Sequence, residues 1–278
     1  MEKDLKALAV DRFGLDPGLS SPEPLAPLLA RILSRRTQRS YTDQPVPDPM
    51  IDLLLAVALS ASAKSDFQQA TVIKLKDPEK RRRIAEHFPA MPWIGTSPAF
   101  LVFCADARRL ERICTMRGHP QRNGDLEGFL NASVDAALAM QTFILAAESV
   151  GLGCCPISVI RNQMTTVARE LKLPDGVFPM AGLCLGYPAR DGFISMRLPP
   201  SATVHTDTYD DSNLETEIEA YDRRRAARHA MPREQQRNPK RFGHADFYGW
   251  SEDKARQAAE PEGASFAQYI KEHGFSFD

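Results

Sequence analysis

Three arginines lie within five positions near the start of the chain. Arg35, Arg36 and Arg39 stand in the stretch RRTQRSY, beside the hydroxyl side chain of Thr37. A guanidinium group donates paired hydrogen bonds to phosphate oxygens and keeps its charge at any working pH. The cluster therefore fits a phosphate receptor. A solvated helix end is the alternative, because most charge runs in soluble proteins are only that.

The composition restricts whose phosphate this would be. The chain has 278 residues and a formal net charge of -1, so no strong overall field draws it toward nucleic acid or an acidic membrane. No stretch approaches the roughly 18 consecutive apolar residues of a transmembrane helix, and the first residues lack the apolar core of a signal peptide. We expect a cytoplasmic protein with no nucleic-acid partner and no membrane partner.

Other catalytic motifs are missing from the sequence. The five cysteines show no CxxC spacing and the six histidines no HExxH spacing, which argues against a disulfide framework and against a protein-bound metal. The sequence also lacks GxGxxG, GxxxxGKS and GxSxG patterns, so dinucleotide-fold, P-loop and serine-hydrolase functions lose their usual support. We expect no metal and no catalytic acid, base or nucleophile from the protein.

The elements that would position the arginines follow from hydrophobic periodicity. Helical patterns cover 28–36, 50–62, 77–88, 134–150 and 161–174, and strand-like runs cover 71–76, 99–106 and 180–188. Asp48 or Pro49 marks the start of the second helix. The stretch GLGCCPIS at 151–158 predicts an irregular turn. The arginine cluster then lies at a helix end, before a rigid turn.

Two segments have an unusual composition. Asp135 and Glu148 are the only charges between residues 134 and 150, which predicts a helix at the centre of the molecule or in a subunit interface. From residue 213 onward the chain is polar, with arginines interleaved among aromatics. Such a segment would contact single-stranded nucleic acid by stacking, wrap a partner subunit, or offer cations to an anionic substrate.

Four segments taken in order resemble the nitroreductase family. They are RRTQRSY, SAKSDFQQ at 62–69, GLGCCPIS at 151–158 and GYPARDGFISMRLP at 186–199. The similarity is greatest to the oxygen-insensitive, NADPH-linked nitroreductase and flavin reductase group. It implies an α+β fold with a central, mostly antiparallel sheet flanked by helices, in an intertwined homodimer. The implied organisation is an N-terminal segment at 1–27, an FMN-binding core at 28–212 and a C-terminal extension at 213–278.

The resemblance implies FMN as the cofactor, with the arginine cluster at its phosphate. The implied FMN contacts are Arg35, Arg36, Thr37, Arg39, Ser62, Lys64, Ser65, Gln69, Pro156, Ile157, Ser158 and Arg197. Those at 62–69 would meet the flavin of the neighbouring subunit. The chain departs from the family pattern at Lys64 and Asp66, where serines are usual, at Met91 for a glutamine, at Ser158 for a glycine and at Ser195 for a lysine. Arg190 would be an alternative phosphate contact.

The implied activity is hydride transfer from NADPH, or NADH, through flavin N5 to a flat, electron-poor acceptor such as a nitroaromatic, a quinone or a flavin. The kinetics would be ping-pong, and the flavin would carry the chemistry. Arg233, Arg237, Lys240 and Arg241 would bind the 2'-phosphate of NADPH. Alternatives are another reaction on the same scaffold, such as dehalogenation or enal reduction, and a non-enzymatic flavin-binding protein. Replacing Ala139 by arginine is expected to abolish both the dimer and the retention of flavin.

Overall fold

The computed structural model describes residues 4–19, 26–122, 124–263 and 265–275. The chain divides into two compact units, and each unit consists of two stretches of sequence. The sheet unit comprises residues 36–192 and 263–278, and the helical unit comprises residues 1–35 and 193–262. These boundaries follow packing, while the functional division at residues 27 and 212 stays a prediction.

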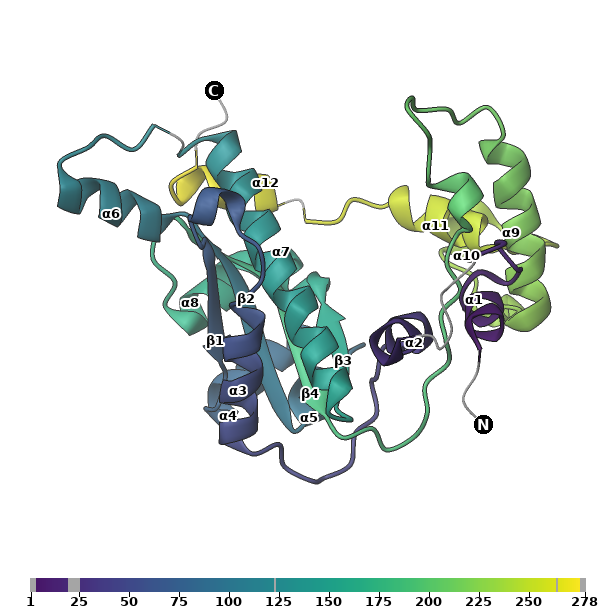
Figure 1. Ribbon diagram of the computed structural model, residues 1–278, viewed down its shortest axis with the longest axis horizontal. Helices are drawn as coiled ribbons and strands as arrows, with labels where there is room; N and C mark the ends of the chain where they lie inside the picture. The colour runs from purple at the N-terminus through teal and green to yellow at the C-terminus, as the bar shows by residue number, and fades with distance from the viewer. Residues whose placement is uncertain (1–3, 20–25, 123, 264, 276–278) are drawn as a thin grey trace. The chain divides into compact units, whose positions relative to one another are not determined.

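A four-stranded sheet forms the centre of the sheet unit (Figure 1). Its strands are β1 (Ala70–Lys74), β2 (Ala99–Asp106), β3 (Gly153–Ile157) and β4 (Val177–Gly186). They lie in the order β1-β2-β4-β3, and every neighbouring pair is antiparallel. The α+β class and the antiparallel sheet predicted from the sequence are therefore confirmed.

One face of the sheet is covered by α3 (Asp48–Ala58) and α7 (Leu126–Ser149) (Figure 1). Because side chains alternate along a strand, Leu101 and Phe103 of β2 point to this face and pack in one core cluster with both helices. Ala139 of α7 belongs to the same cluster and is 3% exposed. An arginine at position 139 would therefore disrupt the core of the single chain, so loss of the dimer in that variant would not report on a subunit interface, and the prediction stays untested.

The opposite face carries a second cluster. Phe100 and Val102 point there, against α4 (Pro78–Ala85), α5 (Trp93–Thr96) and α8 (Met164–Leu171). The 3-10 helix η2 (Ser158–Gln163) leads into α8. The remaining helices of the sheet unit are η1 (Lys64–Asp66), α6 (Arg108–Arg117) and α12 (Phe266–Glu272).

A third cluster fixes α12 at the end of the sheet. The ring of Phe129 on α7 stacks on Phe178 of β4 at 5.2 Å, and Phe275 lies 5.6 Å from Phe178, edge to face. Tyr269 and Ile270 of α12 are buried in the same cluster. Residues that follow the helical unit in the sequence thus complete the core of the sheet unit.

Other expected elements are shifted by a few residues, since β4 spans Val177–Gly186 and α8 begins only at Met164, but α7 and β3 differ most from the sequence-based expectation. α7 begins at Leu126, well before residue 134, because the side chain of Asp125 accepts a hydrogen bond from the amide of Glu127 and caps an earlier start. The stretch expected to be a turn at 151–158 contains β3, which pairs with β4 from Gly153 to Ile157. Its glycine and cysteines serve a strand whose partner is distant in sequence.

By length and composition alone α7 is long and apolar enough to cross a membrane, since its most apolar window has a mean hydropathy of 1.4. Core helices of soluble proteins meet the same test. α7 packs on the sheet through small buried residues, including Ala132, Ala136 and Ala147. Its two charged side chains in the predicted apolar stretch, Asp135 and Glu148, are buried as well.

The helical unit contains α1 (Leu5–Phe13), α2 (Pro27–Ser34), α9 (Leu214–Arg228), α10 (Pro239–Phe242) and α11 (Trp250–Ala258), with the 3-10 helices η3 (Pro200–Ala202) and η4 (Arg233–Gln235). α9 and α11 pack through Tyr221 and Trp250, whose rings lie 5.3 Å apart, edge to face. Gly249 at the N-cap of α11 has no side chain to offer. Asp222 of α9 takes that role and accepts the amide of Ser251 at 3.0 Å.

Candidate functional site

Residues 36–41 of the sheet unit, called the arginine segment below, lie along the start of β3. The amide of Gln38 donates to the carbonyl of Cys154 at 2.9 Å, and the amide of Thr42 donates to Tyr187 at 2.9 Å. Gly153 makes this approach possible, since a Cβ atom there would lie 2.5 Å from Cγ of Gln38. Arg36, Thr37 and Arg39 are thereby held beside β3 and the chain that leaves β4.

The two arginines of this segment have different surroundings. Nη1 of Arg36 lies 3.2 Å from Oδ1 of Asp191, whereas its Nε is buried and has no hydrogen-bond partner among the described residues. The guanidinium group of Arg39 lies 5.7 Å from the ring centroid of Trp93. Arg36 therefore retains an unused donor, which a ligand oxygen would satisfy.

Half-buried Tyr41 and the buried thiols of Cys155 and Cys184 lie next to this segment. The hydroxyl of Tyr41 donates to the carbonyl of Gln38 at 2.6 Å, and burial raises the pKa of Tyr41 above its usual range. Burial also raises the pKa of Cys155, although Arg39 opposes this shift, and it raises the pKa of Cys184 to about 12. These groups are neutral supports at physiological pH.

The turn predicted to approach a flavin lies at the end of β3. Ile157 is buried opposite Gly182, whereas Pro156 and Ser158 are exposed. Gly182 has no room for a side chain, because a Cβ atom would lie 2.5 Å from Cζ of Phe100. Met91, at a position where a polar contact is usual, packs instead against the core on this face.

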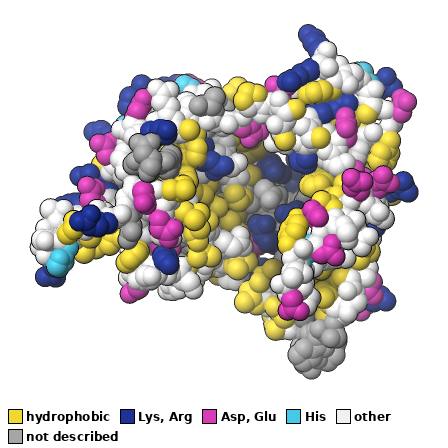
Figure 2. Space-filling view, turned by 90° about the horizontal axis from the view of Figure 1, so that it is seen from above, with side chains coloured by type: hydrophobic (Ala, Val, Ile, Leu, Met, Phe, Trp, Pro, Cys, Tyr) yellow, Lys and Arg dark blue, Asp and Glu magenta, His cyan; other side chains and the backbone are white. Residues whose placement is uncertain are grey.

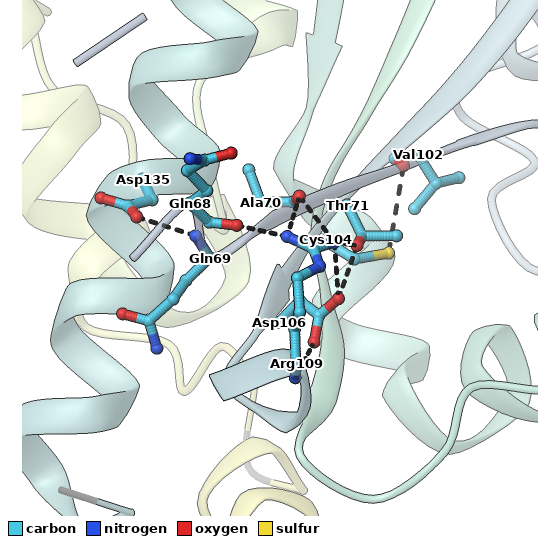
Figure 3. A network of polar contacts seen from close by, with 9 residues as sticks. All are labelled: Gln68, Gln69, Ala70, Thr71, Val102, Cys104, Asp106, Arg109 and Asp135. Carbon is cyan, nitrogen blue, oxygen red and sulfur yellow. Dashed lines mark hydrogen bonds and ion pairs between the residues drawn. The ribbon is translucent and has the colours of Figure 1, made fainter. Parts of the chain in front are cut away.

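The loop at 62–69 follows α3 and leads into β1. Ser62, Lys64 and Ser65 are exposed there, whereas Gln69 is 1% exposed, with its Oε1 lacking a hydrogen-bond partner among the described residues. A cavity of about 520 Å³ lies along the loop and the end of α3. Asp135 of α7 and Arg109 of α6 bind the loop from within the unit (Figure 3).

The sheet unit holds these two sets of predicted flavin contacts at opposite corners. The arginine segment lies at β3, level with Gly186 at the end of β4. The loop at 62–69 precedes Ala70, which pairs with Ala105 at the far end of β2 on the other edge of the sheet. A single copy of this unit therefore does not bring the loop to the arginine segment.

Arg35 and Arg197 belong to the helical unit, where Arg12 links their chain segments. Arg12 lies at the end of α1, is buried, and donates to the carbonyls of Arg35 at 2.6 Å and Ser195 at 2.9 Å. The amide of Arg197 donates in turn to the carbonyl of Arg12 at 2.8 Å. Sequence reasoning missed Arg12, because its partners are far away along the chain.

The four basic residues predicted to bind NADPH also lie in the helical unit. Arg237 forms an ion pair with Asp253 at 2.9 Å, and Arg241 forms one with Glu260 at 2.7 Å. Arg233 and Lys240 are exposed. Two of the four cations are therefore engaged with acidic residues of their own unit.

The surface carries both signs of charge. Figure 2 shows lysines and arginines interspersed with acidic side chains over the visible face. In the described part of the chain, no group of three or more histidine, cysteine, aspartate or glutamate side chains is arranged to hold a metal. Hydrogen-bond donors for an anion, rather than metal ligands, are thus what the candidate site offers.

The sheet unit has an α+β architecture. Its arginine and hydroxyl side chains lie beside the edge strand β3. The nitroreductase family model matches residues 32–187, and the model of that family's C-terminal domain matches residues 195–278. The chain belongs to the nitroreductase family.

The relatives include proteins named as an FMN reductase and as a nitroreductase. The chain is 38% identical over 200 residues to an FMN reductase [NAD(P)H] of Bacillus subtilis, covering 70% of this chain and 80% of the relative. It is 35% identical over 185 residues to the oxygen-insensitive NADPH nitroreductase of Salmonella typhimurium, covering 66% of this chain and 75% of the relative. The solved structure of B. megaterium NfrA2 superposes with a TM-score of 0.82 at 30% identity, covering 91% of this chain and 100% of that one.

Proposed function

We infer that the protein is an oxidoreductase that binds FMN and passes hydride from NADPH or NADH to a flat, electron-poor acceptor. The observation that carries this proposal is the arginine segment, which the fold fixes beside β3 within the part matched by the family model. Relatives named as NAD(P)H-dependent FMN reductases and as a nitroreductase support the same class of reaction.

The donor groups fit an FMN phosphate. Arg36 has a buried Nε with no hydrogen-bond partner among the described residues, and Thr37 and Arg39 add a hydroxyl and a second guanidinium group in the same segment. Charge-assisted hydrogen bonds from such groups are the strong ones for phosphate. Arg35 and Arg197 of the helical unit stay predicted ligands of the same group.

When bound, FMN supplies the hydride chemistry between the nicotinamide and the acceptor. The protein's part is to bind and orient. Pro156 and Ile157 are fixed by the pairing of β3 with β4, and Ser158 follows them at the start of η2. The backbone of these three residues would align the ring, while the loop residues Ser62, Lys64, Ser65 and Gln69 would meet its other side. Lys64, if it lies near the ring, adds positive charge that favours an anionic reduced flavin.

We also propose that the functional form is a homodimer. The sheet unit places the loop at 62–69 and the arginine segment at opposite corners, so a loop from a second copy would complete the first copy's site. Apolar side chains exposed on α3 and α7 suit such an interface. They are Leu53, Val57, Leu126, Leu130, Val134 and Leu138.

The visible absorbance spectrum of the purified protein, recorded before and after adding NADPH without air, tests the proposal. We expect flavin bands that bleach on addition and return when a quinone or nitroaromatic is supplied, with parallel double-reciprocal plots. Bands that persist with both nicotinamides would favour a flavin carrier. Bleaching without reoxidation by these acceptors would favour another reaction on the same scaffold. A protein that takes up no FMN would refute the proposal.

A substitution of Arg36 tests the phosphate assignment. Arg36→Met is expected to weaken FMN binding roughly tenfold or more, since a hydrogen bond to a charged group contributes about 1.5–3 kcal/mol. Riboflavin lacks the phosphate, so its affinity should stay unchanged. Flavin fluorescence titration measures both, and Arg117→Met on the exposed end of α6 is the control. An equal loss for both flavins would contradict a phosphate contact.

A further inference from the structure

The loop that precedes β1 has a backbone conformation that its residues do not favour. Ser65, Asp66 and Gln68 have φ angles of 49°, 57° and 54°. These values lie in the left-handed region, which side chains with a Cβ atom enter at a cost in free energy. Such conformations persist only where surrounding contacts impose them, and they concentrate at functional sites.

A single buried carboxylate binds both ends of this loop. Asp135 of α7 is 3% exposed. Its Oδ1 accepts the amide of Lys64 at 2.9 Å. Its Oδ2 accepts the amide of Gln69, also at 2.9 Å (Figure 3). Asp135 stands in a largely apolar helix. Its two hydrogen bonds to loop amides compensate for the burial of its carboxylate.

A second helix holds the exit of the loop. The guanidinium group of Arg109 on α6 donates to the carbonyls of Gln68 and Ala70 and to Oγ1 of Thr71 (Figure 3). Asp106 orients this group, since its Oδ2 lies 3.0 Å from Nη2 of Arg109 and also accepts the hydroxyl of Thr71 at 2.6 Å. Asp135 and Arg109 thus bind backbone atoms of the loop and of Ala70, and the side chain of Thr71. The side chains of Lys64 and Ser65 stay exposed to solvent.

We propose that Asp135 and Arg109 are positioning residues that force the loop at 64–69 into the left-handed conformation in which it contacts the flavin ring. The inference rests on the proposed FMN function. Neither residue needs to touch the cofactor, because both act through the backbone of the loop. The cavity of about 520 Å³ beside the loop is lined by Asp135, Arg109 and Ser62, so both positioning residues border the same space as one of the predicted flavin contacts.

The test is Asp135→Asn, which keeps the shape of the side chain. One carboxylate oxygen becomes an NH₂ group that faces an amide N–H, so one of the two loop contacts is lost. We expect the affinities for FMN and riboflavin to fall by the same factor, about tenfold, because the loop meets the ring and not the phosphate. Hydrogen exchange at the amides of Lys64 and Gln69 should become faster.

Relief of backbone strain supplies a readout that a general loss of stability would not give. Glycine adopts positive φ without steric cost, so adding Gln68→Gly to Asp135→Asn should restore a measurable part of the ring affinity. The matched control is Ala63→Gly in the same background, since Ala63 has a φ of -130° and gains nothing from glycine. Equal effects of the two glycines would overturn the proposal.

Arg109 gives a second route if Asp135→Asn fails to fold. Arg109→Met should weaken both flavins alike, whereas Arg112→Met on the same helix should leave them unchanged. Faster exchange at Lys64 and Gln69 with unaltered flavin affinity would overturn the inference while leaving the FMN function intact. A wild-type protein that binds neither flavin would overturn the proposed function, and the inference with it.

Discussion

Three buried charged side chains of this protein bind main-chain atoms of loops. Asp135 binds two loop amides, Arg12 binds the carbonyls of Leu33, Arg35 and Ser195, and Arg256 binds those of Arg237 and Gly243. Each of these three residues is buried. A buried charge is tolerated when hydrogen bonds replace its hydration, and here the replacement also fixes loops that carry predicted site residues.

Most of the cysteines are buried thiols that burial keeps unreactive. Burial raises the pKa of Cys104 and of Cys184 to about 12, and it raises the pKa of Cys155 as well. Because the thiolate is the reactive form, these thiols are protonated at about pH 8. Cys154 is buried too, whereas Cys114 is partly exposed.

We therefore expect one of the five cysteines to react quickly with Ellman's reagent in the native protein, and all five after unfolding in guanidinium chloride. Cys114→Ser should abolish the fast phase. Two or more fast thiols in the native protein would contradict the assigned burial.

α7 is the element that joins the core to the predicted subunit contact. One side of the helix supplies Ala132, Ala136 and Ala139 to the interior. The other side exposes Leu126, Leu130, Val134 and Leu138 at intervals of four residues, a spacing that aligns them on one helix face. An apolar stripe of this kind on a helix that also packs on the sheet is typical of a buried partner interface.

Val134→Arg should dissociate the predicted dimer. Val134 is 45% exposed in the single chain, so an arginine there would lose its hydration only when the interface forms. The unfolding free energy of the monomer should change by no more than about 0.5 kcal/mol. Size-exclusion chromatography with light scattering measures the mass, and Val134→Ala serves as the control. A dimer that survives Val134→Arg would exclude this face as the interface.

The structural elements and buried residues differ in how well they could be predicted from the sequence. The strand at 99–106 was predicted with both of its ends, because a continuous apolar run indicates a strand that is buried on both faces. β3 was missed, since Gly151, Gly153 and Pro156 signal a turn locally, whereas the pairing of β3 with β4 is non-local. Arg12 gave no local signal at all, because Ser195 lies 183 positions away. Asp135 did give a signal, as a charge in an apolar helix, but its partners could not be named.

At the scale of the whole molecule, the chain passes from one compact unit to the other three times. Each unit has its own polar anchor as well as its own core. In the helical unit, Asp222 of α9 caps α11 by accepting the amide of Ser251 and contacts its hydroxyl. In the sheet unit, Asp135 has the comparable role between α7 and the loop before β1.

Asp222→Ala tests whether the two units are energetically separate. Loss of the carboxylate leaves the Ser251 amide unpaired, which costs about 1–3 kcal/mol. We expect faster hydrogen exchange in α9 and α11, with β2 and β4 unchanged. Asp211→Ala, in the exposed segment before α9, is the control. Equally faster exchange throughout the sheet unit would show that the units unfold together.

The position of α12 has a consequence for synthesis of the chain. Tyr269, Ile270 and Phe275 cover the aromatic core built around Phe129 and Phe178, yet the ribosome makes them only after the whole stretch 193–262 of the other unit. The sheet unit cannot close its core while it is being translated, although domains usually fold in the order in which they emerge. In a nascent chain that pauses before residue 266, Phe129 and Phe178 lack these covering side chains and are accessible to chaperones.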